Sequence, residues 1–434
     1  MRRQRAAVTI TWMLGVALLI PSATAPQGVT YSDQIARIVQ RHCQGCHRQG
    51  DIAPFPLLTW EDAYRERQKI LRRVETRKMP PWKPVPGFGD FLDSRRLPEA
   101  DIAAIRAWVE AGAPEGDPRD LPPARQFPET WSLGAPDLVL AAEPYEVPSG
   151  DRDLYRCFVI PTDSPQDRYL SGVEFVPGSR RIVHHVLTYI DTAGRAEALD
   201  RADPGPGYTC FGGPGFLPTT MGIGGWAPGA PPQASPAGVG VLLPAGARVV
   251  MQVHYHNRTG SVQSDRTRIG LHFARATVDK RVRVIPVLDR SFVIPAGAGR
   301  HEVRASFTLP PHWNMHAIGV SPHMHLLGRE MKVTATSPDG TARPLIYIDD
   351  WDFHWQGTYT FATPVPLPGG TRIDVEAVYD NSEGNRRNPA KPPRDTGWGE
   401  GTTDEMCIAF IRVTVDAEHL NHVPRYGATL EGKP

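Results

Sequence analysis

The sequence of 434 residues has no excess of charge of one sign, because 48 lysines and arginines face 47 aspartates and glutamates. A net charge of +1 gives no sign of a nucleic-acid-binding surface, so we expect no nucleic-acid partner. Long helices are not expected either, since 44 prolines and 41 glycines favour turns and short strands. At about 150 residues per domain, the length predicts three units.

A long apolar run is also missing. The basic residues 1–5 lead into an apolar stretch, Ala6–Ile20, of about 15 residues, whereas a membrane-spanning helix needs roughly 20. The small residues Ala23-Thr24-Ala25 follow, and this pattern predicts a secretory signal peptide at residues 1–25, with an uncleaved anchor as the alternative. We therefore expect a periplasmic or secreted bacterial protein with no stable membrane insertion after cleavage.

Cysteine is scarce, with five residues in the whole chain. Cys43 and Cys46 belong to a motif described next, which leaves an odd number for an oxidising compartment. We predict a disulfide between Cys157 and Cys210, and a free thiol at Cys407.

The segment Cys43-Gln44-Gly45-Cys46-His47 has the C-x-x-C-H pattern of covalent haem attachment, in which His47 ligates the iron. A redox or zinc-binding cysteine pair is the alternative. Downstream, Met79 stands before Pro80-Pro81-Trp82 in a turn that cannot continue as a helix, which suits a second axial ligand. Ordinary core packing is the other interpretation of Met79. Ligation by His and Met favours an electron carrier.

Helical spacing of apolar residues predicts a helix over 31–41, begun by Ser32 or Asp33, and another over 98–111. Together with the motif, this stretch resembles cytochrome c. We therefore expect a small all-α cytochrome c domain at residues 26–120, with one covalently bound haem c.

After Leu121 the pattern changes to short alternating apolar runs separated by glycine and proline. Many short strands argue for a mainly β fold. A stretch of roughly 300 residues is large for one sandwich, so we divide it near 283–289. The expected architecture is two consecutive antiparallel jelly-roll-like β-sandwiches, over residues 121–285 and 286–434.

Histidines gather in three of the predicted strands, at Val183-His184-His185, Gln252-Val253-His254 and His323-Met324-His325. Imidazole binds both oxidation states of copper, and the soft thioether of Met406 favours Cu(I). Alternate residues of a strand share a face, so His323 and His325 can chelate one ion. Adjacent His184 and His185 can do so only at a bulge or a strand end.

These motifs resemble the copper type II monooxygenases, the family of dopamine beta-hydroxylase and peptidylglycine alpha-hydroxylating monooxygenase. The order of the motifs along the chain also agrees, with Leu154-Tyr155-Arg156-Cys157 before the histidines and Asp404-Glu405-Met406-Cys407 after them. The resemblance implies two copper ions. One is an electron-relay copper on His184, His185 and His254, and the other is an oxygen-activating copper whose catalytic ligands are His323, His325 and Met406.

In that family, O2 and a small-molecule substrate react at the Met-ligated copper, and a C–H bond becomes hydroxylated. Electrons come from an external donor, ascorbate or here a periplasmic redox protein, and we expect the fused haem to pass them to the relay copper. Peptide-hydroxylating relatives place an arginine where this sequence has Ser321, and polar residues where it has Ile408 and Phe410. These departures favour an apolar or aromatic substrate.

Five further histidines are expected to be structural: His256, His272, His312, His316 and His354. Two rival functions stay open. One is a non-catalytic haem and copper protein that binds copper or only transfers electrons. The other is a structural or carbohydrate-binding module with adventitious zinc, although a thioether is a poor zinc ligand.

Overall fold

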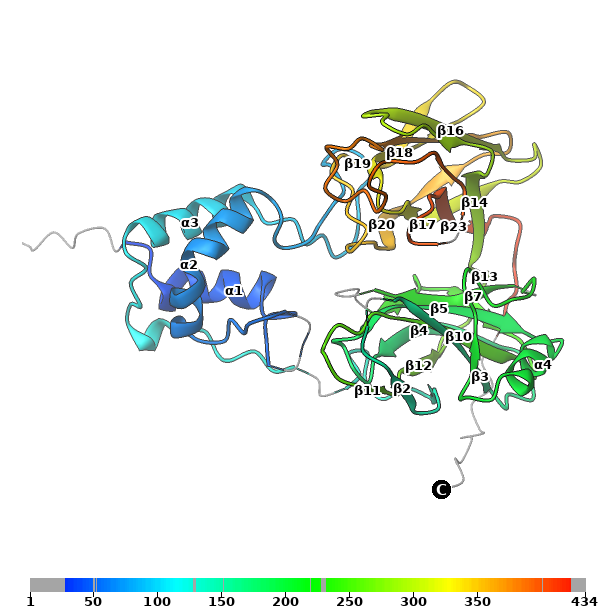
Figure 1. The fold of residues 1–434 in the computed structure, drawn as a ribbon, viewed down its shortest axis with the longest axis horizontal. Helices are drawn as coiled ribbons and strands as arrows, with labels where there is room; N and C mark the ends of the chain where they lie inside the picture. Colours follow the sequence, from blue (N-terminus) through cyan, green and yellow to red (C-terminus); the bar gives the residue numbers. More distant parts are fainter. Residues whose placement is uncertain are drawn as a thin grey trace, which may run out of the picture.

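The computed structural model describes residues 28–422 except 50, 52, 128–129, 151, 219, 228–231 and 400. It has three parts, namely a helical module near the N-terminus and two β-sandwiches (Figure 1). Strands hold 37% and helices 13% of the chain, which confirms the mainly β prediction. The predicted signal peptide, residues 1–25, lies outside the described residues. Among those described, no helix has both the length and the apolarity to cross a membrane.

The helical module contains a π-helical turn and three helices around one small core. Their bounds are Tyr31–Ile35 for η1, Ala36–His42 for α1, Trp60–Glu75 for α2 and Glu99–Glu110 for α3. The first helical segment begins at Thr30, whose hydroxyl accepts the amide hydrogen of Asp33, and not at the predicted Ser32 or Asp33 cap. A short 3-10 turn, η2 (Pro118–Asp120), precedes the sandwiches.

The first sandwich packs two main sheets over a common core. One sheet has the order β1 (Leu138–Ala141), β12 (Arg268–Phe273), β4 (Arg168–Val176), β9 (Val239–Leu243) and β13 (Lys280–Arg281). The short strand β8 (Gln233–Ala234) also pairs with β4. The other sheet has the order β6 (Tyr208–Thr209), β3 (Leu154–Pro161), β10 (Arg248–Tyr255), β5 (Val183–Asp191) and β7 (Thr220–Trp226). Three smaller elements complete it, namely β2 (Tyr145–Val147), β11 (Gln263–Asp265) and α4 (Arg195–Ala202).

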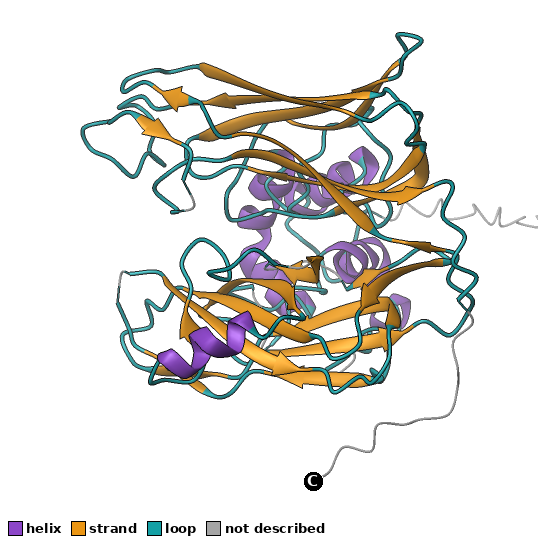
Figure 2. Cartoon of the chain, turned by 90° about the vertical axis from the view of Figure 1, so that its right-hand side faces the viewer, coloured by secondary structure: helices purple, strands orange, loops and turns teal. Residues whose placement is uncertain are grey.

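The second sandwich begins with β14 and is stacked on the first (Figure 2). Its sheet β14-β23-β17-β20 consists of Arg283–Asp289, Cys407–Val415, Met315–His323 and Tyr359–Leu367. The sheet β16-β21-β18-β19 consists of His301–Thr308, Arg372–Tyr379, Gly328–Thr336 and Ala342–Ile348. A two-stranded pair, β15 (Val293–Ile294) with β22 (Thr396–Gly397), lies beside them.

A disulfide joins Cys157 on β3 to Cys210, and Cys407 is a buried free thiol, as predicted. The bridge closes a segment with a sequence separation of 53, so it removes much conformational freedom from the unfolded chain. We expect Cys157→Ala with Cys210→Ala to lower the free energy of unfolding by about 4 kcal/mol. Urea unfolding measures this loss. The control Cys407→Ala should cost clearly less, and equal losses in the two proteins would contradict the expectation.

One segment of the helical module packs into the second sandwich, and we call residues 83–92 the strap. Its backbone bonds to both edge strands, with Val85 N donating to Tyr347 O on β19 at 2.8 Å and Leu92 N to Thr360 O on β20 at 2.9 Å. Phe91 is only 8% exposed and belongs to the core of the second sandwich. The strap therefore fills the gap between the edges of two sheets.

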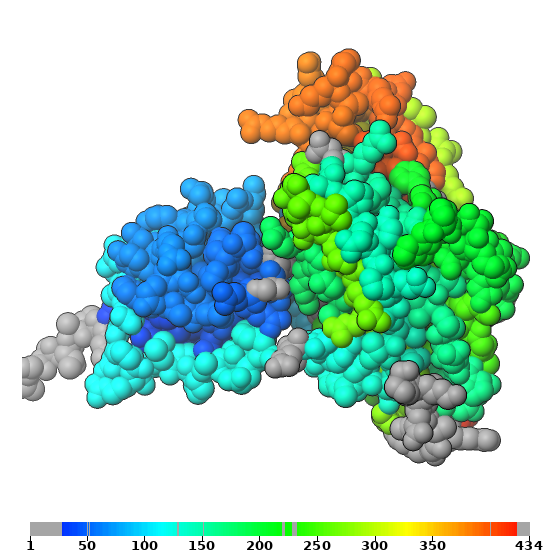
Figure 3. All heavy atoms as spheres, turned by 60° about the horizontal axis from the view of Figure 1, so that its bottom comes forward, coloured from blue at the N-terminus to red at the C-terminus, as the bar shows by residue number. Residues whose placement is uncertain are grey.

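The module also contacts the first sandwich through its predicted haem-binding loop. Arg180 Nη1 lies 3.5 Å from Asp51 Oδ1, and Arg180 stands four positions before His184 on the way into β5. In the space-filling view the module is a separate lobe beside the larger body of the sandwiches (Figure 3). The two tethers, the strap and this ion pair, fix the module to both sandwiches.

Candidate metal centres

A bulge brings His184 and His185 together at the start of β5. His185 stands opposite His254 on β10, whereas the next residue of β10, Tyr255, stands opposite Val183, so His184 is the extra residue. The extra residue turns out of the regular alternation. The irregularity that the adjacent pair required is therefore present.

The three imidazoles form a cluster that fits a metal ion. The Nδ1 atoms of His184 and His254 each lie 3.3 Å from Nδ1 of His185, and the possible ligand atoms of all three lie within 4.8 Å of one another. Two nitrogens bound tetrahedrally at about 2.0–2.1 Å from one ion stand about 3.3 Å apart. The observed spacing is that of a ligand shell.

The surroundings of His184 and His185 favour the neutral imidazole, the form that binds metals. Burial and the neighbouring His254 lower the pKa of His184 to about 3, and the same causes hold the pKa of His185 well below its usual value. His254 Nε2 lies 3.3 Å from Asp153 Oδ1. Burial acts to raise the pKa of Asp153, but hydrogen bonds with His254 and His256 outweigh it and lower that pKa. Asp153 can thus accept the Nε2 hydrogen and leave Nδ1 of His254 for the ion.

His323 and His325 form a second pair at the end of β17, with ring centroids 5.1 Å apart. Met324 between them is fully buried in the core, so strand alternation continues past the end of β17. His323 Nδ1 donates to Gln356 Oε1, and His325 Nδ1 donates to the carbonyl of Asp404 at 3.1 Å. Both Nε2 atoms remain for a metal, and both rings are oriented by a second partner.

Met406 lies in the segment that runs beside this pair. Its position just before β23 follows from the register, in which His323 pairs with Ile408. Two groups fix that segment. Tyr379 Oη donates to Met406 O at 2.7 Å, and the carboxyl of Glu405 accepts the backbone N–H groups of His325 and Leu327. Glu405 is fully buried, and burial raises its pKa to about 8 against these hydrogen bonds.

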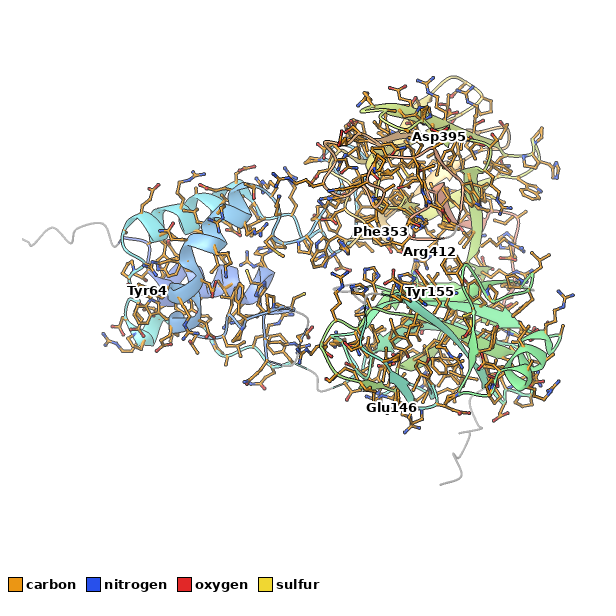
Figure 4. The ribbon with its side chains drawn as sticks, in the orientation of Figure 1. Tyr64, Glu146, Tyr155, Phe353, Asp395 and Arg412 are labelled. Carbon is orange, nitrogen blue, oxygen red and sulfur yellow. A yellow bond between two sulfur atoms is a disulfide. The ribbon has the colours of Figure 1, made fainter. Side chains whose placement is uncertain are left out.

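The loop 351–358 between β19 and β20 touches both clusters. The ring of Phe353 stacks on His184 at 5.7 Å and meets His325 edge-on at 5.6 Å between centroids. Phe353 lies on the side of the second sandwich that faces Tyr155 of the first (Figure 4). Tyr155 in turn stacks on His254 at 4.3 Å and hydrogen-bonds Thr402 at 3.2 Å. Aromatic rings therefore connect the two clusters, a connection that the sequence did not predict.

His354 in this loop was expected to be structural, yet its Nδ1 lies 3.4 Å from Nε2 of His184. One imidazole cannot give both nitrogens to one ion, so a metal on Nδ1 of His184 leaves Nε2–H to donate to His354. We expect His354→Ala to weaken copper binding at the first cluster by about 10- to 100-fold, the usual loss for such a partner. Competition with a Cu(I) chelator measures it. His354→Asn keeps an acceptor near Nδ1 and should restore most of the affinity, and an unchanged affinity in His354→Ala would contradict the expectation.

The remaining predicted site residues lie in the helical module. Cys43 and Cys46 are free thiols in the turns after α1, and His47 Nδ1 donates to Phe55 O at 3.0 Å. That hydrogen bond orients the ring and leaves Nε2 for an axial bond to iron. These residues fit a covalently bound haem. Met79 follows α2 in the loop that leads to the strap.

Comparison with known families supports the copper interpretation. Residues 283–418 match the family model "Copper type II ascorbate-dependent monooxygenase, C-terminal domain". The match covers β14 to β23 and includes His323, His325 and Met406. It indicates a copper cofactor and the oxidoreductase chemistry of a monooxygenase, with O2, a small-molecule substrate and a reductant such as ascorbate.

Whole-chain comparisons add little. No curated protein matches the chain. Solved structures include the VP2 subviral particle of infectious bursal disease virus, at 13% identity over 67% of this chain and 81% of that chain with a TM-score of 0.18. PNGF-II in the C2 space group has 10% identity over 69% of this chain and 66% of that chain, with a TM-score of 0.24. Likeness at this level carries no functional argument.

Proposed function

We propose that this protein is an exported copper-dependent monooxygenase that hydroxylates a C–H bond of a small apolar or aromatic substrate with O2. The observation that carries the proposal is the pair of imidazole clusters on facing sandwiches, with Phe353 in contact with both. The family match over residues 283–418 supports it for the second sandwich.

The chain supplies two ligand sets of different character. His184, His185 and His254 would hold one copper ion, and His323, His325 and Met406 the other. When bound, copper supplies one-electron transfer at the first set and activation of O2 at the second. Imidazole alone serves both oxidation states, whereas the thioether of Met406 favours Cu(I), the state that reacts with O2.

Protein groups around the second set hold its ligands and exclude water. Gln356 and the carbonyl of Asp404 orient the two imidazoles, and Trp351 Nε1 donates to His325 O at 3.1 Å. Phe353, only 6% exposed, covers His325 on the side of the first sandwich. Rigid ligands and a covering ring favour reaction with substrate over loss of reactive oxygen species to solvent.

Electrons would enter through the helical module, with haem held by Cys43, Cys46 and His47 and a second axial bond from Met79. The Asp51–Arg180 ion pair supports this route, because it sets the haem-binding loop against the approach to His184. Stopped-flow mixing of reduced haem with the oxidised copper protein tests it. Haem should reoxidise at least as fast as turnover, and slower reoxidation would assign the supply to another donor.

The function itself is tested by product analysis. The full chain is purified after periplasmic expression, its copper and iron are counted, and a panel of phenethyl and aliphatic compounds is incubated with ¹⁸O2. We expect two copper ions and one iron per chain, and a product with one ¹⁸O atom. Bound metals that cycle between redox states without an oxygenated product would instead indicate an electron-transfer protein. Zinc in place of copper would indicate the structural alternative.

A further inference from the structure

Arg412 is an arginine whose guanidinium has no partner among the residues that the structure describes. It lies on β23, the central strand that runs from Cys407 to Val415. By contrast, the buried Arg156 pairs with Asp203, and the half-buried Arg329 pairs with Asp380. Burial alone lowers the pKa of Arg412, and no carboxylate acts against it. Because the residue is partly exposed, an anion from outside the chain can reach the guanidinium and pair with it.

The side chain faces the first sandwich and not the core. Cys407, Ala409, Ile411 and Val413 point into the core of the second sandwich. By strand alternation, Arg412 points to the opposite face. Figure 4 places Arg412 on the side of the second sandwich that faces Tyr155. The guanidinium therefore lies on the face of the second sandwich that is turned toward the first (Figure 4).

The same face leads from Arg412 to the second cluster. Ile408 and Phe410 share it, and their partners across the strand pair are His323 and Ser321. Opposite Arg412 stands Gly319, where an added Cβ would lie 3.7 Å from Cδ of the arginine, so the stem of Arg412 lies over this glycine. Arg412 stands four positions after Ile408 on the strand, so their Cα atoms are about 13 Å apart. Two apolar side chains thus lie between a cation and a metal-binding histidine.

We propose that Arg412 binds a carboxylate of the substrate, whose apolar or aromatic body lies over Phe410 and Ile408 with its reacting carbon toward His323. The position of that carbon rests on the proposed function, whereas binding of the acid does not. A guanidinium pairs with a carboxylate through two parallel hydrogen bonds, and such bonds are the stronger kind. The substrate class is then a short aryl or alkyl carboxylic acid, and not a hydrocarbon or an amine.

Calorimetric titration of the full copper-loaded chain with three probes of one shape tests the proposal. The probes are 3-phenylpropionate, its amide 3-phenylpropanamide, and 3-phenylpropylamine. Wild-type protein should bind the carboxylate at least about tenfold more tightly than the amide, the gain of one charge-assisted contact. Arg412→Gln should abolish this preference, and Arg412→Lys should keep part of it.

Two controls separate recognition from structure. Arg283→Gln changes an arginine of the neighbouring strand β14 that already pairs with Glu418, and it should keep the preference. Arg412→Gln should unfold at the same temperature as wild type or higher, because it removes an unpaired charge. No preference in wild type, its persistence in Arg412→Gln, or a lower unfolding temperature of that variant would overturn the proposal. The titration measures binding and needs no turnover. The carboxylate preference can therefore be absent from a protein that incorporates ¹⁸O, and it can be present in a protein that does not.

Discussion

Replacing His325 by alanine is expected to lower turnover by at least about a thousandfold, since a catalytic metal contributes several kcal/mol and each 1.4 kcal/mol is tenfold in rate. The remaining imidazole and thioether are too few to hold a copper ion tightly. Copper content should fall from two ions to one per chain, and the absorption spectrum of the proposed haem should not change. Metal analysis together with oxygenated product per minute measures both effects.

His316→Ala is the matched control for this experiment. His316 lies on the same strand β17, but its Nδ1 is paired with Asp416 at 2.7 Å near the other end of the strand. It should keep two copper ions and near-normal turnover. If His325→Ala also keeps two copper ions and full turnover, the ligand assignment for the second sandwich is wrong.

Replacing Glu405 by alanine is expected to lower the free energy of unfolding by about 2–6 kcal/mol, because two buried backbone N–H groups lose their acceptor at about 1–3 kcal/mol each. Those groups belong to His325 and Leu327, so the same change frees the loop that carries one proposed ligand. Copper affinity of the second site should fall as well. Urea unfolding and copper titration measure the two losses.

Glu405→Gln separates the contributions of the two hydrogen bonds to stability, since an amide offers one acceptor oxygen in place of two. Its loss of stability should lie between those of wild type and Glu405→Ala. Glu376→Ala on the exposed face of β21 serves as the control and should change stability little. Full stability of Glu405→Ala would mean that solvent or another group replaces the carboxyl.

The sequence predicted secondary structure correctly where a regular spacing or alternation of apolar residues dominates the segment. Apolar spacing placed α3 within a residue at each end, and alternation predicted a mainly β remainder. Helix α2 was not predicted, although Thr59 and Asp62 form a capping box at its start. The strap could not be predicted, because its pairing with β19 and β20 joins positions far apart in the chain.

At the site, the period of two in a strand was sufficient to place His323 and His325 on one face and to require a bulge or a strand end at His184 and His185. The contacts of Phe353 and His354 with the first cluster depend on how two sandwiches meet, which no local pattern encodes. Arg412 was missed for a related reason. A sequence shows that an arginine is present, but only the assembled sheet shows that none of the described residues pairs with it.

The strap has a consequence for how the protein matures. Phe91 is translated early, whereas the strands that the strap packs against, β19 and β20, are synthesised some 250 residues later. The side chain of Phe91 therefore stays exposed until β19 and β20 have been synthesised, and contacts between such distant positions form slowly. A second sandwich expressed alone, from β14 onward, would expose the apolar surface that the strap covers, and it is expected to aggregate. We therefore expect the N-terminal lobe to be needed for the solubility of the last part of the chain, independently of its proposed role in electron transfer.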